Sequence, residues 1–254
     1  DNYTELVASF RGSAGTKVLL AYRRDTEELT VELTRREIDI PTITTTMLDN
    51  IAYLRFSDIS NNPSAPLDAA IRQANQERAQ ALVFDIRGLA SDNMEIIGDM
   101  LDTLVGKMTI IYAQDQQGEL QELMESDDAQ VELPMVVLAD NTTSGTWELF
   151  AQVLRDTGKA RTVGETTAGK GTRQSFYKLK NGAAVYLTVA RYAGPSRETY
   201  DQVGVPADYE IHYSADMDKF LTMGDLEYDN QLRKALEIAS TAVKTETANA
   251  QANG

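Results

Sequence analysis

The spacing of apolar positions divides the chain into two parts. In residues 17–24 and 28–36, apolar and β-branched residues alternate with polar ones, which predicts two strands joined by a polar turn. Ile40-Pro41 then marks a boundary, and from residue 51 onward strand-like and helix-like patterns take turns. The predicted strands are residues 51–56, 81–86, 109–112 and 135–138, and the predicted helices are residues 66–79, 94–104, 147–154 and 232–242.

Strands that alternate with helices predict an α/β fold, in which a mainly parallel sheet carries packed helices. The four predicted strands are expected to share that sheet. Further along, two alternating segments flank Lys180-Asn181-Gly182, which predicts a hairpin. Residues 1–38 are expected to form a β-rich satellite of the core at residues 39–243, and the small polar residues 244–254 a disordered tail.

The chain carries a formal net charge of −15 over 254 residues. Phosphate backbones and anionic membrane surfaces attract basic proteins, so this charge argues against both as partners. No run approaches the roughly 18 apolar residues of a membrane helix. No signal-like leader is present at Asp1, as expected of a mature or trimmed form. A membrane anchor upstream of Asp1 in the parent protein is compatible with this.

Composition narrows the chemistry. The chain has no cysteine, which excludes a thiol nucleophile, disulfides and cysteine-based zinc sites. Its one histidine, His212, excludes a histidine-rich metal cluster, so no metal or cofactor is predicted. His212 lies in an alternating strand-like segment and is interpreted as structural, although a Ser-His-Asp hydrolase would have to use it. A general base is therefore expected to be lysine, aspartate or glutamate.

A glycine-rich segment at residues 164–171 nearly spells a phosphate-binding P-loop. Gly171 stands where that motif needs a hydroxyl, and the following residues alternate like a strand instead of opening a helix. Nucleotide binding is therefore not predicted. Two interpretations remain: a plain turn between strands, or a loop that presents Lys170 to a site.

Two other segments lie where a predicted strand ends and a helix begins. In residues 141–148, the turn around Ser144-Gly145-Thr146 is expected at the carboxyl edge of the sheet, where the sites of α/β folds lie and a helix N-terminus can stabilise an oxyanion. In residues 85–92, Ser91-Asp92 occupies a similar place. The simpler interpretation of both segments is helix capping, by Ser144 or Thr146 and by Ser91, Asp92 or Asn93.

Taken in order, these segments resemble the carboxyl-terminal-processing (tail-specific, S41-type) serine peptidases. The segments that carry the resemblance are Asp85-Ile86-Arg87, the lysine loop from Gly164 to Gln174, Ala190-Arg191-Tyr192 and Asp229-Asn230-Gln231-Leu232. Residues 11–18 and 34–38 resemble the closing part and the exit of the PDZ domain in that family.

The resemblance implies a ClpP/crotonase-like peptidase core with a partial PDZ-like satellite. It implies a serine nucleophile activated by an unprotonated lysine, here Lys170, which Gln174 positions. Such a lysine needs a lowered pKa to act as a base. The resemblance also implies a polypeptide substrate or peptide ligand and an extracytoplasmic location, with which the absence of cysteine is compatible. A homo-oligomer is also compatible with the sequence.

The departures from the family pattern concern the reacting positions. Alignment on Glu148 places Gly145, which has no side chain, where the family has its nucleophile; Ser144 is one residue early and Thr146 one late. Ser91-Asp92 replaces a Gly-Gly pair of the oxyanion hole, and a carboxylate there opposes a developing negative charge. We therefore expect a degenerate homologue that binds peptides without cleaving them. The alternatives are an active serine endopeptidase that uses Ser144 with Lys170, and a protein of another class.

Overall fold

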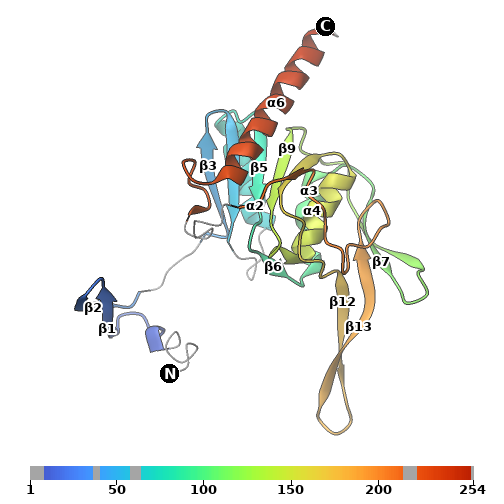
Figure 1. Cartoon of the computed structure of the whole chain (residues 1–254). Helices are drawn as coiled ribbons and strands as arrows, with labels where there is room; N and C mark the ends of the chain where they lie inside the picture. Colours follow the sequence, from blue (N-terminus) through green and yellow to red (C-terminus); the bar gives the residue numbers. More distant parts are fainter. Residues whose placement is uncertain (1–8, 37–40, 58–63, 214–221, 253–254) are drawn as a thin grey trace. The chain divides into compact units, whose positions relative to one another are not determined.

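The computed structural model describes residues 9–36, 41–57, 64–213 and 222–252. The chain forms two compact units, Asp1–Pro41 and Thr42–Gly254 (Figure 1). The first unit contains an antiparallel hairpin of β1 (Lys17–Arg24) and β2 (Glu27–Thr34), which confirms the two strands predicted there. The predicted boundary at residue 38 lies outside the described residues.

A six-stranded sheet forms the centre of the second unit. Its strand order is β14-β11-β9-β5-β4-β3, and every neighbouring pair is parallel except β3 and β4. The strands are β3 (Ile43–Leu48), β4 (Ile51–Phe56), β5 (Ala81–Asp85), β9 (Met135–Ala139), β11 (Ala160–Gly164) and β14 (Tyr209–Glu210). The predicted α/β fold with a mainly parallel sheet is confirmed.

Helices cover both faces of this sheet (Figure 1). On one face lie α2 (Ser64–Gln76), α3 (Met94–Leu104) and α4 (Thr146–Asp156), and on the other lies α6 (Asn230–Ala252). In β5, Leu82 and Phe84 pack with the three-helix side, whereas Ala81 and Val83 pack with α6. Because both faces are buried, the strand is apolar from Ala81 to Phe84 instead of alternating.

The strand predicted at residues 109–112 was assigned to the wrong sheet. It is β7 (Thr109–Gln114), which lies in a separate four-stranded antiparallel sheet of order β12-β13-β7-β8. The partners are β8 (Leu120–Glu125), β12 (Thr172–Lys178) and β13 (Ala184–Ala193). In the central sheet both edges of β5 are already occupied by β4 and β9. The turn at residues 115–119, with Gly118 at a φ of 86°, instead folds β8 back onto β7.

Helix α6 is longer than the sequence pattern indicated. It runs through Ala252, whereas an irregular tail was expected from residue 244. Its threonine hydroxyls donate to carbonyls one turn earlier, as Thr245 Oγ1 does to Thr241 O at 3.0 Å and Thr247 Oγ1 to Val243 O at 2.9 Å. These bonds satisfy the polar side chains within the helix, so a polar composition does not end it.

One buried arginine joins two segments that are far apart in sequence. The guanidinium of Arg87 donates to Asp85 at 2.8 and 2.6 Å and to Asp229 at 2.9 and 2.7 Å, and all three side chains are almost fully buried. Tyr53 donates a further bond to Asp85 at 2.6 Å. Burial alone would raise the pKa of Asp229, but the bonds and charge of Arg87 outweigh it and lower that pKa. Asp229 also caps α6 through the N–H of Leu232.

This arginine is expected to be a large contributor to stability. Arg87→Met leaves two buried carboxylates without a counter-charge, so the free energy of unfolding should fall by roughly 3–5 kcal/mol. Chemical denaturation measures the change, and Arg161→Met, on the exposed side chain of β11, is the matched control. Adding Asp85→Asn and Asp229→Asn to Arg87→Met should restore part of the loss. Equal stability of the Arg87 and Arg161 variants would contradict the assignment.

Candidate functional site

The candidate site lies where three neighbouring parallel strands end. The strands β5, β9 and β11 are adjacent in the central sheet, and their carboxyl ends lead into the segments 86–92, 140–145 and 165–171. Carboxyl ends of parallel strands lie at one edge of a sheet, which is where open α/β folds place their sites. The three segments that the sequence singled out therefore come together.

The second of these segments is shaped by Asp140. One carboxylate oxygen of Asp140 accepts bonds from the N–H groups of Thr142 at 2.9 Å and Thr143 at 3.0 Å, which forms a tight turn. The same oxygen accepts from the N–H of Gly88 at 3.2 Å. Asp140 thus holds the segment after β9 against the segment after β5.

A two-residue parallel ladder then aligns the predicted nucleophile and oxyanion regions. In it β10 (Ser144–Gly145) pairs with β6 (Ala90–Ser91), so that Gly145 lies opposite Ser91. The hydroxyl of Thr146 donates to Ser91 O at 3.1 Å. Thr146 therefore anchors the start of α4, and its hydroxyl is already engaged.

Gly145 occupies a sharp corner between β10 and α4. Its φ of 73° and ψ of −132° lie in a region that side chains strongly disfavour. A Cβ atom built on Gly145 would overlap the carbonyl oxygen of Ser91 and lie 3.3 Å from Asp92 Oδ1. The backbone therefore turns as an exposed-nucleophile corner does, but the neighbouring strand occupies the space for a side chain.

Glu148 connects this corner to the lysine loop. Its carboxylate is fully buried and accepts from the N–H groups of Gly145 at 3.0 Å, Gly169 at 2.7 Å and Lys170 at 2.7 Å, and from the hydroxyl of Thr167. Four donors compensate for the burial of the charge. The sequence analysis had used Glu148 only to anchor the alignment with the family, and no local pattern indicates its contacts with residues 167–170.

Tyr200 was missed by the sequence analysis. Its side chain is buried, and its hydroxyl donates to Gly145 O at 2.9 Å. Burial and the nearby carboxylate of Glu148 raise the pKa of Tyr200 well above its ordinary value, so the hydroxyl stays protonated and can donate. Tyr200 therefore gives the corner a further anchor besides the ladder.

The side chains of the predicted base and its partner are exposed. The Lys170 backbone lies at the corner through its bond to Glu148, but its side chain is exposed, as is that of Gln174 on β12. Within the described part of the chain, neither Lys170 Nζ nor Ser144 Oγ makes a hydrogen bond or ion pair, although Ser144 itself is buried. The structure brings Gly145 and the backbone of Lys170 into one region through Glu148, without a bond between the side chains of Ser144 and Lys170.

The capping interpretation holds for the segment after β5. The side chain of Asn93 accepts from the N–H of Ile96 at 3.1 Å, which caps α3, and the hydroxyl of Ser91 accepts from the N–H of Asn93 at 3.1 Å. Asp92 is left exposed beside the corner. Ser91 thus serves the helix start while its backbone borders Gly145.

His212 lies at the surface near the start of the lysine loop. Its Nδ1 is 2.9 Å from Glu165 Oε1, and this hydrogen bond raises the pKa of His212. His212 is not bonded to Ser144, which is consistent with its structural interpretation. Among the described residues, no three histidine or acidic side chains cluster as a metal site, and no helix is both long and apolar enough to cross a membrane.

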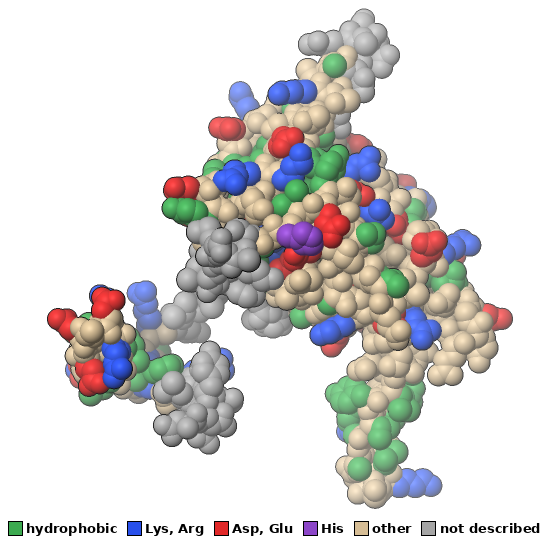
Figure 2. Space-filling model, viewed as in Figure 1, with side chains coloured by type: hydrophobic (Ala, Val, Ile, Leu, Met, Phe, Trp, Pro, Cys, Tyr) green, Lys and Arg blue, Asp and Glu red, His purple; other side chains and the backbone are tan. Residues whose placement is uncertain are grey.

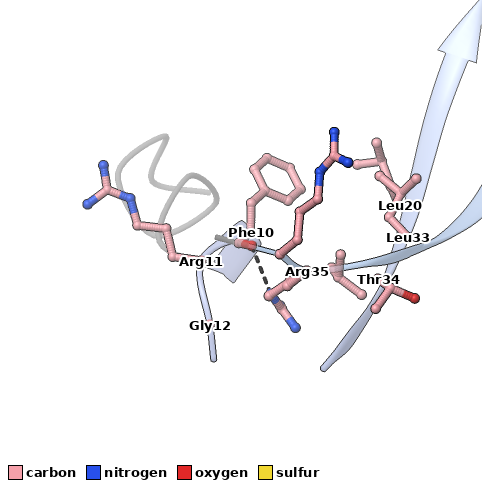
Figure 3. Close-up of a pocket in the computed structure, with 9 residues that line it drawn as sticks. Phe10, Arg11, Gly12, Leu20, Leu33, Thr34 and Arg35 are labelled. Carbon is pink, nitrogen blue, oxygen red and sulfur yellow. Dashed lines mark hydrogen bonds between the residues drawn. The ribbon is translucent and has the colours of Figure 1, made fainter. Parts of the chain in front are cut away.

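A separate hollow of about 700 Å³ lies within the first unit. Figure 3 shows it beside the hairpin, with Phe10, Leu20 and Leu33 among the residues that line it and with Arg35 bonded to Phe10 O at 2.9 Å.

Comparison with known proteins identifies the family. The model of peptidase family S41 matches residues 50–211, which include all three segments of the site. The chain belongs to peptidase family S41. Residues 1–38, which resemble part of a PDZ domain, lie outside the match to the S41 model.

The similarity to curated proteins covers more of this chain than the match to the S41 model does. A carboxyl-terminal-processing protease of Synechocystis sp. is 29% identical over 211 residues, covering 80% of this chain and 49% of that protein. Carboxyl-terminal-processing peptidase 2, chloroplastic, of Arabidopsis thaliana is 28% identical over 233 residues, covering 85% and 44%. A solved photosystem II D1 C-terminal processing protease has the same fold, with a TM-score of 0.64 at 24% identity over 79% of this chain and 57% of that one. The chain spans about half the length of the curated relatives it matches.

The Glu148 contacts give a prediction for this S41 site. In Glu148→Gln, the amide nitrogen would face N–H donors, so the free energy of unfolding should fall by roughly 2–4 kcal/mol. Glu95→Gln is the matched control, because Glu95 is also a first-turn acid, in α3, but is exposed. Denaturant titrations of both variants measure the difference. A loss no larger for Glu148→Gln than for Glu95→Gln would contradict the role given to Glu148.

Proposed function

We propose that this S41 chain is a degenerate carboxyl-terminal-processing peptidase homologue, which binds polypeptide through its Ser/Lys-type site without cleaving it. The observation that carries the proposal is Gly145 at the corner where the family resemblance expects the nucleophile. Glycine cannot attack a carbonyl carbon, and the backbone oxygen of Ser91 occupies the space that a side chain would need.

The neighbouring hydroxyls do not replace the missing nucleophile in this geometry. Thr146 donates its hydroxyl to Ser91 O, so it is committed to the backbone. Ser144 has no bond to Lys170, and activation of a serine by lysine requires them to come within hydrogen-bond reach. In the alternative, an active endopeptidase, the exposed side chain of Lys170 has to move toward Ser144.

The oxyanion region supports the same proposal. Catalysis of acyl transfer needs donors around the developing negative charge. Here Asp92 places a carboxylate near the corner, with Oδ1 3.3 Å from the position of a Gly145 Cβ. Removing one oxyanion donor typically costs about 10²–10³ in rate, and an added negative charge acts in the same direction.

Polypeptide is the ligand class that the family favours. The relatives described above carry names of carboxyl-terminal-processing enzymes, which act on polypeptides. Lys170 keeps an exposed ammonium group beside the corner, where it can attract a carboxylate of a bound chain. The S41 core thus retains a means of holding a peptide that does not depend on a nucleophile.

We infer further that the first unit is the closing part of a PDZ-like domain and that the protein works outside the cytoplasm. The hairpin of β1 and β2 follows the Arg11–Val18 run on which the PDZ resemblance rests. The Arabidopsis relative is named as chloroplastic, and the family resemblance points to an extracytoplasmic compartment. A peptide-binding assay on the parent protein with and without residues 1–38 tests the first inference, and fractionation of cells tests the second.

Cleavage of an unfolded, fluorescently labelled test protein measures the central prediction. The unaltered chain should cleave no faster than Lys170→Ala. Gly145→Ser alone should stay inactive because it leaves the carboxylate of Asp92 beside the corner and keeps serine at position 91, where the backbone is less free than that of glycine to move its carbonyl away from a new side chain. Gly145→Ser combined with Ser91→Gly and Asp92→Gly should gain activity, and adding Lys170→Ala should remove that gain.

The alternative gives a different pattern in the same assay. An unaltered chain that digests the test protein rapidly, and that loses this activity in Ser144→Ala, would establish Ser144 as the nucleophile. The proposal of a degenerate site would then be wrong.

The proposed function also predicts binding of the labelled protein without cleavage. Fluorescence anisotropy should show weaker binding by Lys170→Ala than by the unaltered chain.

A further inference from the structure

The hairpin of β12 and β13 extends away from the body of the second unit. We refer to residues 172–193, which comprise both strands and their turn, as the arm (Figure 1). Large apolar side chains are exposed on the arm: Tyr186 is 70% exposed, Leu187 51% and Phe176 48%. Figure 2 shows these apolar side chains gathered on the extended hairpin. Apolar surface that is left in water in this way typically marks an interaction site.

The arm is basic in an otherwise acidic chain. Residues 172–193 contain four lysine and arginine residues and no acidic residue, although the chain has a net charge of −15. Lys178 and Lys180 lie near the tip, and both side chains are exposed. Among the described residues, neither has a hydrogen bond or an ion pair. The arm therefore offers unpaired positive charge next to apolar surface.

The opposite edge of the same sheet is acidic. Residues 115–132, which include β8, contain seven aspartate and glutamate residues and no basic residue. Glu122 and Glu125 are exposed on β8, and no ion pair is formed by either of them within the described part of the chain. Leu120 on the same strand is 37% exposed. The two edges of the sheet are thus opposite in charge, and both carry apolar side chains.

The backbone of both edges is available for pairing. In the four-stranded sheet β12 pairs only with β13 and β8 only with β7 within the described ranges, so each outer edge has unpaired N–H and C=O groups. All three pairings are antiparallel, so β12 and β8 run in opposite directions. A β8 strand placed beside the β12 strand of a second copy, with the copies in the same orientation, would be antiparallel to it.

We propose that the arm of one copy of this chain docks on the β8 edge of a second copy. Charge complementarity selects this occupant, because a contact between two arms would bring lysines together and a contact between two β8 edges would bring glutamates together. The contact is head-to-tail, since it uses different surfaces of the two copies. The proposal concerns assembly alone and holds whether or not the S41 site cleaves peptides.

Charge reversal on each surface tests the proposal. Sedimentation velocity should show the unaltered chain self-associating at low salt, and less so at high salt, because exposed charges are screened. Lys178→Glu/Lys180→Glu and Glu122→Lys/Glu125→Lys should each weaken self-association about tenfold or more, because two attractions become repulsions. Circular dichroism checks that each variant is folded.

A control and a mixing experiment make the test specific. Arg161→Glu/Lys244→Glu is the control for Lys178→Glu/Lys180→Glu. It introduces the same change in charge on exposed side chains outside the arm and should leave association unchanged. An equimolar mixture of Lys178→Glu/Lys180→Glu (the arm variant) and Glu122→Lys/Glu125→Lys (the edge variant) should associate again, because the reversed arm of one complements the reversed edge of the other.

Three results would overturn the proposal. They are an unaltered chain that stays monomeric at every concentration and salt, association that survives in both charge-reversed variants, and failure of the mixture to associate although each variant is folded. Binding of an acidic synthetic peptide to the arm, lost in the arm variant without any change in the mass of the protein, would show that the arm receives another polypeptide and not a second copy.

Discussion

The geometry of the candidate site depends on the buried carboxylate of Glu148. Its two oxygens accept from four groups, one at the corner of Gly145 and three in the lysine loop about twenty residues later. Removing this carboxylate would leave several buried N–H groups without acceptors, each at a free-energy cost. The corner and the loop therefore form one rigid piece. The side chain of Lys170 projects from this piece into solvent, so the position of its backbone is fixed while the ammonium group can move.

A second buried network fixes the rest of the S41 core around this piece. Arg87 follows β5, and its contacts with Asp229 tie the start of α6 to the carboxyl edge of the sheet, on which the site is built. Charges buried in this way are costly unless each is fully bonded. Under the proposed function, this network holds the scaffold, whereas Gly145, Ser91 and Asp92 differ from the family pattern at the positions where bonds would be made and broken.

The sequence predicted elements better than their arrangement. The bounds of α3 agree with the predicted residues 94–104 because its apolar spacing is regular and Asn93 caps it. The sheet to which β7 belongs could not be predicted, since strand pairing depends on which edges other strands have already occupied. From the family resemblance we predicted that Gly145, Ser91 and Lys170 lie in one region. The roles of Glu148 and Tyr200 arise from contacts across 21 and 55 residues, which leave no periodic signal.

The backbone corner at Gly145 also limits which residue can occupy this position. A side chain at a φ of 73° is strained by about 1–3 kcal/mol, and glycine removes that strain. Once the side chain is absent, the strand that carries Ser91 can lie closer to the corner, as it does here. A serine at this position would have to introduce the strain and displace the Ser91 carbonyl in a single step. A single substitution at this corner therefore meets two free-energy costs at once, and both favour glycine there.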